Sequence, residues 1–447
     1  MPVSGSAQVE LRPEQMRGLA VAMLQAGDVT QAVALATALL QRDSEDLAAL
    51  LVLAQAAFQT GDFATARHYA ARAHRVAEPE QTRYSAARLA ALAAAQDGRF
   101  NAGLIWLRRA LVVAPTPEDE NQTEFDANRL RRLARWETGV TLSFSPSNNV
   151  NGGATTAINE VDGLPGIGRL SADAQALAGW EGELGVALGY KLAETRVAQT
   201  TASLRVNMSG VVFSPEAIAA LAADESDLVA ADLSTAMVEF RVTQERALPN
   251  GAISFSAAVG TVWVAGARDY DFVSLRFARD LRFNDRDTWQ IAGAVERHLE
   301  VSNGEIEDDR YSLQSSWSRL RANGDQISAA FSYDTIRSEN VNEAQDSITL
   351  QGRYGWSEPL GPAYVSLSLG AQVSKYDQFY AITLSSVPVP GGRQDLRAFA
   401  DLTLYFPDWS YAGFAPEVTL SASTTDSNVS RFTRENLSIS FGYRSTF

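Results

Sequence analysis

The sequence predicts an α + β chain of two parts, an N-terminal helical solenoid followed by a 14-stranded antiparallel transmembrane β-barrel. Three observations indicate this fold. Residues 13–115 are rich in Ala and Leu and poor in β-branched residues, which is typical of helices. From Trp136 onward, apolar side chains recur at every second position, the period of a strand. Short and long connections alternate between these strands, as they do in barrels that cross a membrane.

Composition restricts the chemistry that is available to the chain. Its 447 residues include no Cys and only 3 His, so we expect no disulfide, no metal site and no cofactor site. The 53 acidic and 38 basic residues give a formal charge of −15, which argues against nucleic acid as a partner. Met1–Ser4 has neither the basic start nor the apolar segment of a signal peptide, so we expect any export signal to be absent from this sequence.

Three turn signals divide the helical part into units. They begin at Gly27, Gly61 and Gly98, so their spacing is 34 and then 37 residues. A small residue follows each turn at a similar offset, and these residues are Ala32, Ala66 and Gly103. Glycine permits a tight turn, and small side chains let helices approach closely. The pattern resembles the tetratricopeptide repeat, which has two antiparallel helices in each unit; a generic helical bundle is the alternative.

The resemblance to these repeats implies a concave groove that binds segments of other proteins. Mapping the repeat pattern onto the sequence places seven polar side chains on that groove: Glu14, Arg17, Gln25, Gln55, Gln59, Arg88 and Gln96. The alternative for each of them is a solvated side chain without a partner protein.

Residues 116–135 are predicted to form a linker helix. Thr116 and Pro117 are typical of a helix start, and three acidic residues follow them in the first turn. Arg129, Arg131, Arg132 and Arg135 cluster at the other end, where they suit a helix C-terminus or, alternatively, contact with lipid head groups or a barrel mouth. We therefore predict a periplasmic helical domain at 1–115, a linker helix at 116–135 and a barrel at 136–447.

The strands are predicted from clean alternation. Ile253, Phe255, Ala257 and Val259 share one face, for example, and polar or small residues lie between them. The predicted strands are 136–145, 178–192, 199–213, 232–246, 252–265, 270–282, 287–299, 310–320, 325–337, 346–357, 363–376, 396–406, 415–425 and 435–447.

Charged residues recur in mid-strand on the face opposite to the apolar one. They are Glu183, Arg205, Glu239, Arg241, Arg276, Glu296, Arg353, Asp401 and Glu417, and His298 is expected to share the face of Glu296. A soluble sheet would present such a face to water, whereas a barrel would line its lumen with it. The alternation of connection lengths favours the barrel, and the strand lengths suit a tilted crossing of the bilayer.

The last strand ends with the chain. Leu437, Ile439, Phe441 and Tyr443 alternate with polar or small residues, and Phe447 is the final residue. This ending resembles the closing strand of bacterial outer-membrane barrels, whose terminal Phe is read by the barrel-assembly machinery, although Ser445 departs from the usual apolar residue. An even number of strands returns both ends to one side. We therefore expect the barrel in outer-membrane lipid and the helical part in the periplasm.

The whole arrangement resembles the surface lipoprotein assembly modifier family. The sharpest local points are the segment 142–151, where the first strand runs into Asn-Val-Asn, and the segment 434–447. The resemblance implies an outer-membrane translocon, expected to be a monomer and not an enzyme, that moves client proteins or lipoproteins from periplasm to cell surface while the repeats engage client or chaperone. No Gly-x-x-x-x-Gly-Lys motif occurs, so we expect no nucleotide hydrolysis to drive transport.

Three other functions stay open. An exopolysaccharide export porin also combines repeats with a barrel, although the interspersed Arg and Glu disfavour an ionic glycan. An outer-membrane enzyme needs a nucleophile, a base and an acid, and His298 is the only His of the barrel, with no recognisable Ser motif beside it. A simple diffusion pore would leave the repeats without a purpose.

Overall fold

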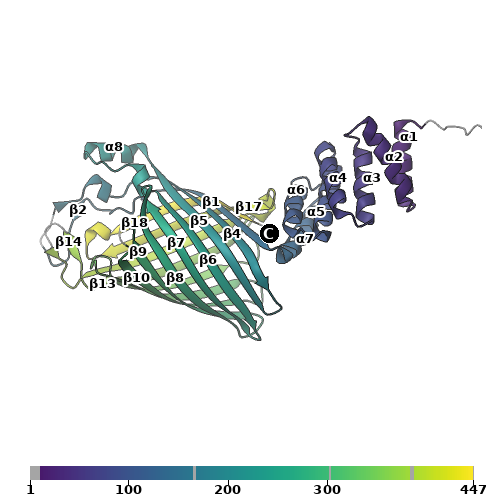
Figure 1. Ribbon diagram of the computed structural model, residues 1–447. Coiled ribbons are helices and arrows are strands. Elements are labelled where there is room, and N and C mark those ends of the chain that lie inside the picture. Colours follow the sequence, from purple (N-terminus) through teal and green to yellow (C-terminus); the bar gives the residue numbers. More distant parts are fainter. Residues whose placement is uncertain (1–10, 165–167, 302–303, 383–386, 446–447) are drawn as a thin grey trace, which may run out of the picture. The chain divides into compact units, whose positions relative to one another are not determined.

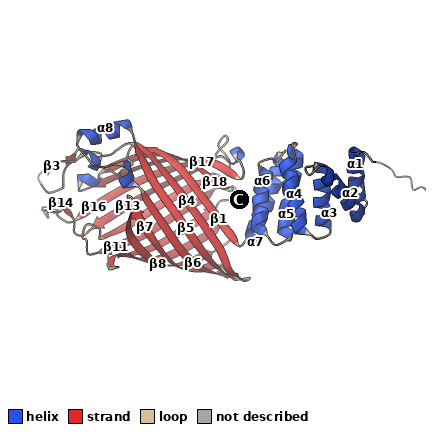
Figure 2. Cartoon of the chain, turned by 45° about the horizontal axis from the view of Figure 1, so that its top comes forward, coloured by secondary structure: helices blue, strands red, loops and turns tan. Residues whose placement is uncertain are grey.

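The computed structural model describes residues 11–164, 168–301, 304–382 and 387–445. The chain forms a helical unit that ends at Arg135 and a sheet unit that begins at Trp136. In Figure 2 the helices are blue and the strands red, and α8 (Pro215–Ala223) is a helix within the sheet unit. The predicted fold class is confirmed, since helices precede a closed barrel of antiparallel strands. Among the described residues, no helix is long and apolar enough to span a membrane.

The described part of the helical unit, residues 11–135, contains seven helices, which form three antiparallel pairs and a final helix. They are α1 (Pro13–Gln25), α2 (Val29–Arg42), α3 (Leu47–Gln59), α4 (Phe63–Val76), α5 (Glu80–Gln96), α6 (Phe100–Leu111) and α7 (Pro117–Leu133). The three predicted turns join the helices of each pair, and Gly27, Gly61 and Gly98 have φ of +85°, +80° and +70°. These are left-handed conformations that glycine adopts without strain.

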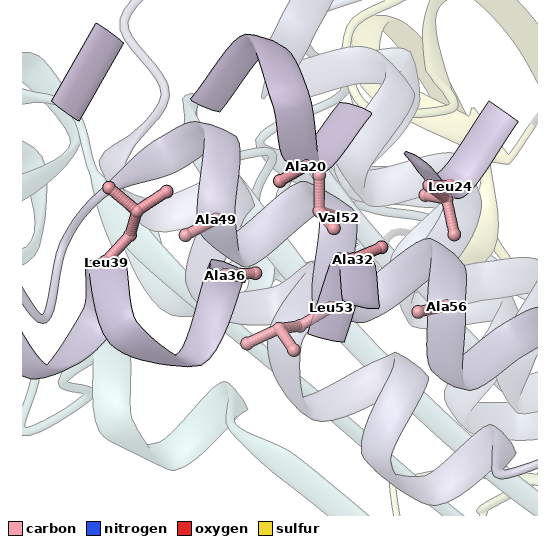
Figure 3. Packing of buried hydrophobic residues seen from close by; sticks show 9 residues of the cluster. All are labelled: Ala20, Leu24, Ala32, Ala36, Leu39, Ala49, Val52, Leu53 and Ala56. Atoms are coloured by element: carbon pink, nitrogen blue, oxygen red, sulfur yellow. The ribbon is translucent and has the colours of Figure 1, made fainter. Parts of the chain in front are cut away.

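Small side chains let the helices of the first two pairs pack closely. Ala20, Ala32 and Ala36 are fully buried, and Leu39 and Leu53 belong to the same buried cluster (Figure 3). Asp28, Asp46 and Asp62 begin α2, α3 and α4 by accepting hydrogen bonds from backbone N–H groups in the first turn.

The final helix packs on the third pair. Ala127 and Leu130 of α7 are buried against Ala91 of α5 and Leu107 of α6. The hydroxyl of Thr123 lies 3.0 Å from that of Tyr84, and both side chains are buried. The segment expected to be a linker helix is therefore a helix with an apolar face of its own.

Fourteen strands close into one barrel in which every neighbouring pair is antiparallel in the registers that are described. The barrel strands are β1 (Trp136–Ser147), β4 (Gly179–Glu194), β5 (Ala198–Phe213), β6 (Thr235–Leu248), β7 (Gly251–Val264), β8 (Ala267–Arg282), β9 (Asp287–Glu300), β10 (Ile306–Leu320), β11 (Gln326–Ser338), β12 (Gln345–Gly355), β13 (Tyr364–Tyr376), β16 (Arg393–Tyr405), β17 (Phe414–Ser427) and β18 (Arg434–Ser445). The predicted strands agree with them to within a few residues. The largest shift is at β10, which begins at Ile306 where the sequence predicted residue 310.

The connections divide between the two ends of the barrel. We call the end with links such as 195–197 and 249–250 the short-turn end, and the other the long-loop end. Helix α8 (Pro215–Ala223) and the short strands β2 (Ile158–Asn159), β3 (Gly168–Arg169), β14 (Tyr380–Ile382) and β15 (Val387–Pro388) lie in long loops. Figure 1 shows α8, β2 and β14 at one end of the barrel.

The two faces of the barrel wall differ in chemistry. Leu184, Leu204, Phe240 and Leu275 belong to exposed apolar rows, which suits contact with lipid tails. Buried side chains of the strands, such as His298 and Glu239, lie on the alternate face. In a barrel wall, a buried strand side chain must point inward, so the alternate face is the lumen.

Aromatic side chains collect at the short-turn end. Trp136 lies 4.8 Å from Tyr190 between ring centroids, and Phe283 lies 6.2 Å from Trp289. Such girdles occur where a barrel meets the boundary between lipid tails and head groups.

Candidate functional site

The barrel lumen holds charged side chains in opposite pairs. The carboxylate of Glu239 accepts two hydrogen bonds from Arg241, at 2.9 and 2.7 Å, and lies 3.9 Å from Arg205. Arg241 also donates to the hydroxyl of Ser256 at 3.1 Å. Glu239 is only 5% exposed, so its charge is held by its partners and not by water.

A second cluster surrounds His298, the only His of the barrel. Its Nε2 lies 2.8 Å from Glu296 and its Nδ1 lies 3.3 Å from Asp308. The ring stacks on Tyr270 with 4.0 Å between centroids, and Arg310 donates two hydrogen bonds to Asp308. This cluster borders a cavity of about 360 Å³. Arg310 and Asp308 pair with each other, and the His298 ring is held by Glu296 and Tyr270, whereas its Nδ1 has no hydrogen-bond partner among the described residues.

The structure places the other predicted lumen residues on the same inner face. Glu183 lies 3.4 Å from the hydroxyl of Ser143. Arg276 donates to Gln314, Arg353 donates to Ser366, and Asp401 accepts from Ser421. Their period-two positions match those of Glu239 and His298, opposite to the exposed apolar rows. Their role in transport stays a prediction.

Positive and negative side chains alternate around this lumen. Arg205, Arg241, Arg310 and Arg353 occur on the same face as Glu183, Glu239, Glu296 and Asp401. A surface of this kind attracts neither sign of charge over a long distance, because neighbouring charges cancel. It suits passage of a chain that carries both signs.

The helical unit has a groove of about 320 Å³ between α5, α6 and α7. Ala91, Leu92, Phe100 and Leu133 give it apolar walls, and Arg88 pairs with Asp126 beside them at 2.5 Å. Leu92 is half exposed, although it is a large apolar side chain. The groove therefore offers apolar surface next to a charged pair, which is the chemistry that binds one or two apolar side chains of a peptide.

Only part of the predicted groove coincides with this one. Arg88 and Gln96 line it, whereas Glu14, Arg17, Gln25, Gln55 and Gln59 are not among its lining residues. Arg17 instead donates to the buried carboxylate of Asp46 at 2.8 Å. Binding of a client at any of the seven positions stays a prediction.

Sequence reasoning missed the residues that α7 brings to the groove. Asp126, Arg129, Leu130 and Leu133 line it, and they come from the segment that was predicted to be only a linker. The signal was present, because Ala127 and Leu130 fall on one side of the helix at a spacing of three residues. Phe447, predicted to be the barrel-assembly signal, lies outside the described residues.

Comparison with known families finds two matches. Residues 248–446 match the family described as "Surface lipoprotein assembly modifier", and residues 23–95 match the tetratricopeptide repeat. Both resemblances in the sequence are confirmed. No curated protein matches the chain.

Solved structures resemble about a quarter of the chain. The type III secretion translocator chaperone SycD of Yersinia enterocolitica is 20% identical over 28% of this chain and 88% of its own, with a TM-score of 0.25. The N-terminal domain of stress-induced protein-1 from C. elegans is 17% identical over 27% of this chain and 94% of its own, with a TM-score of 0.24. At these values the likeness carries no argument about function.

Proposed function

Starting from the surface lipoprotein assembly modifier family, which its barrel region matches, we propose that this protein moves specific client proteins across the outer membrane to the cell surface. The clients are surface lipoproteins or secreted proteins. The match over residues 248–446 supports a role in surface lipoprotein assembly, and it is the observation that carries the proposal.

The lumen supports passage of polypeptide. Some of its charges are paired within the wall, as Arg241 is with Glu239 and Arg310 is with Asp308. Charges of both signs line the wall, so a passing peptide meets no surface with one dominant sign. An ionic glycan carries repeated charge of one sign and would be favoured by a lumen of the opposite sign. The mixed lumen thus favours protein over glycan as cargo.

The helical groove supports engagement of the client or of its chaperone. Leu92, Phe100 and Leu133 offer apolar contact, and the pair of Arg88 and Asp126 offers hydrogen bonds at one side. An unfolded segment with an apolar side chain would bind there weakly and reversibly. Such binding raises the local concentration of client before transfer and needs no nucleotide.

An outer-membrane location fits the barrel and the family. We further propose that the helical unit is periplasmic. Strand β1 begins and strand β18 ends at the short-turn end, because the number of strands is even. Outer-membrane barrels turn their short connections toward the periplasm. The barrel-assembly machinery is the partner that would read the C-terminal strand, and the barrel would act as a monomer.

Reconstitution tests this function. The purified full-length protein is placed in liposomes, and a lipoprotein client is offered on one side together with a periplasmic carrier chaperone. We expect the client to become accessible to protease on the other side only when the protein is present. Absence of transfer, combined with a conductance that an anionic glycan blocks, would favour the exopolysaccharide porin instead.

A further inference from the structure

Strands β1 and β18 meet where the barrel closes, and we call this contact the seam. At every other neighbouring pair of barrel strands, a turn or loop joins the two strands at one end. At the seam, the two strands are the first and the last of the barrel, so no such connection exists. The wall can therefore part there without any change in the path of a connecting loop.

A proline interrupts hydrogen bonding at the seam. Phe144 lies opposite Phe441 and Ser147 lies opposite Ser438, so Pro146 lies opposite Ile439. The N–H of Asn148 donates to the carbonyl of Leu437 across the seam at 3.2 Å. Successive N–H groups of an antiparallel strand alternate between its two neighbours. The backbone N–H at position 146, two residues before Asn148, would therefore point toward Ile439. Because this residue is Pro146, it has no N–H, and the hydrogen bond is missing.

Side chains take over part of the bonding near this proline. The carboxamide of Asn148 accepts from the N–H of Leu437 at 2.7 Å, and the hydroxyl of Ser147 donates to Asn436 at 2.9 Å. Side-chain bonds of this kind break and form again through rotation about single bonds. A ladder of backbone bonds has no such freedom.

The long loops on both sides of the seam pair with each other. Val161 forms an antiparallel bridge with Val429, and both side chains are buried. Beside them, the N–H of Glu160 donates to the hydroxyl of Ser430 at 2.7 Å, and that of Asp162 donates to the carbonyl of Asn428 at 3.0 Å. These contacts form a latch outside the strands that holds the seam closed at the long-loop end.

A lipid-anchored client creates a need for such an opening. Each methylene of an acyl chain costs about 0.8 kcal/mol outside an apolar environment, so acyl chains do not cross a polar lumen cheaply. If the polypeptide uses the lumen while its acyl chains stay in lipid, the segment between them must pass through the wall. A wall that opens at one seam allows this passage.

We propose that the β1–β18 seam is a lateral gate through which the acylated segment of a lipoprotein client leaves the lumen for the lipid. This inference rests on the proposed function and adds the path of the lipid anchor. Pro146 weakens the closed ladder, and the latch of Val161 and Val429 returns the gate to its closed state.

A disulfide across the seam tests the gate. A Cβ added to Gly442 would lie 3.9 Å from the Cβ of Ser143, which is within the range of a disulfide. The natural chain has no Cys, so S143C/G442C would form one defined crosslink. The matched control is G355C/S366C, which joins β12 to β13 with the same Cβ separation of 3.9 Å.

Surface exposure of the client is measured on intact cells with an external protease. Two forms of one client are compared, the acylated lipoprotein and a secreted form whose acylated residue is replaced. We expect the oxidised S143C/G442C lock to lower delivery of the acylated form by about tenfold or more, because a crosslink removes the open state of a gate. Delivery of the other form should change by less than about twofold, and reductant should restore the loss.

Each other outcome has a defined meaning. Normal delivery of the acylated client through the oxidised seam lock overturns the gate, and so does an equal loss of both client forms. If the oxidised G355C/S366C control lowers delivery of the acylated client as much as the seam lock does, the gate is also overturned, because a crosslink anywhere in the wall would then have the same effect. Delivery of neither form by the wild-type protein overturns the proposed function itself, and the gate with it. If the wild-type protein delivers only the acylated form, delivery of that form is compared between the two crosslinked variants. A larger loss with S143C/G442C than with G355C/S366C supports the gate, and an equal loss overturns it.

Discussion

Gly103 lies at a close contact between helices of the helical unit. A Cβ at this position would lie 2.5 Å from Cδ2 of Leu130 and 3.3 Å from the carbonyl oxygen of Ala91. The absence of a side chain is therefore what lets α6 approach both α5 and α7. Gly18 of α1 differs, because a Cβ there would have no neighbour within 4 Å.

Replacement of Gly103 by Leu should destabilise the helical unit by about 1–3 kcal/mol, since the added atoms overlap the packed α7. The measurement is thermal unfolding of the full-length protein followed by helical circular dichroism. Gly18→Leu is the matched control and should not lower the stability, because Leu has a higher helix propensity than Gly. Equal melting curves for the two variants would contradict the packing described for α7.

Asp325 fixes the short turn between β10 and β11. Its carboxylate accepts hydrogen bonds from the Tyr354 hydroxyl, from the N–H of Ser357 at 2.9 Å and from Asn323 at 2.6 Å. These donors, above all Tyr354, hold the pKa of Asp325 well below its usual range. A carboxylate whose pKa is lowered by folding stabilises the fold above its unfolded pKa, and this contribution is lost as the pH falls toward the folded pKa.

The difference in stability between wild type and Asp325→Asn should therefore depend on pH. At pH 7 the wild type should melt at a higher temperature than Asp325→Asn. This difference in melting temperature should shrink as the pH is lowered below about 3.9, the ordinary pKa of Asp. Heat-modifiable migration of the barrel in gels, recorded after incubation at each pH, gives the melting temperatures. A gap that stays constant from neutral to strongly acidic pH would show that the charge of Asp325 does not matter.

At the scale of elements, the groove between α5, α6 and α7 makes the sharpest prediction. Leu92→Asp places a charge on its apolar wall and should slow client transfer by about tenfold, the equivalent of about 1.4 kcal/mol. Ile105→Asp is the matched control, because Ile105 is similarly exposed on α6 but does not line the groove. Both variants are compared by the initial rate of client transfer in the reconstituted system. Equal rates for the two variants would mean that the client does not use this groove.

The periodic elements could be predicted from sequence because their pattern is local. Ile253, Phe255 and Val259 alternate without interruption, and the predicted strand at 252–265 lies within one residue of β7 at both ends. The helix turns were equally readable, since Gly27, Gly61 and Gly98 mark positions that need positive φ. In each case, neighbours along the chain carry the whole signal.

Contacts between distant segments could not be predicted in this way. Val161, Phe379, Val389 and Val429 form one buried cluster, although they come from three different loops. Arg393 and Asp395 form a buried ion pair at the start of β16, in a stretch whose polar residues suggested a loop. Nothing in the local pattern of a loop tells which other loop it will contact. The groove was predicted only in part for the same reason, because one of its walls comes from α7, which is distant in the sequence from α5.

At the scale of the whole molecule, the chain combines a barrel wall whose outer face is apolar with a lumen that carries charges of both signs. The outer rows, such as Leu275 and Val295, give the wall its affinity for the membrane. The inner pairs, such as Arg241 with Glu239, keep the lumen polar without a dominant sign. Together with the match of residues 248–446 to the surface lipoprotein assembly modifier family, this division supports a role in surface lipoprotein assembly.

The proposed transfer of a client to the cell surface can be tested by digesting a lipoprotein with protease on intact cells. A lipoprotein client is produced in cells with and without the full-length protein, and external protease is added to intact cells while a periplasmic marker reports on leakage. We expect the client to be digested only in cells that contain the protein, and the periplasmic marker to stay whole. A client that stays protected from external protease, in cells whose outer membrane contains the folded barrel, would contradict the proposed function.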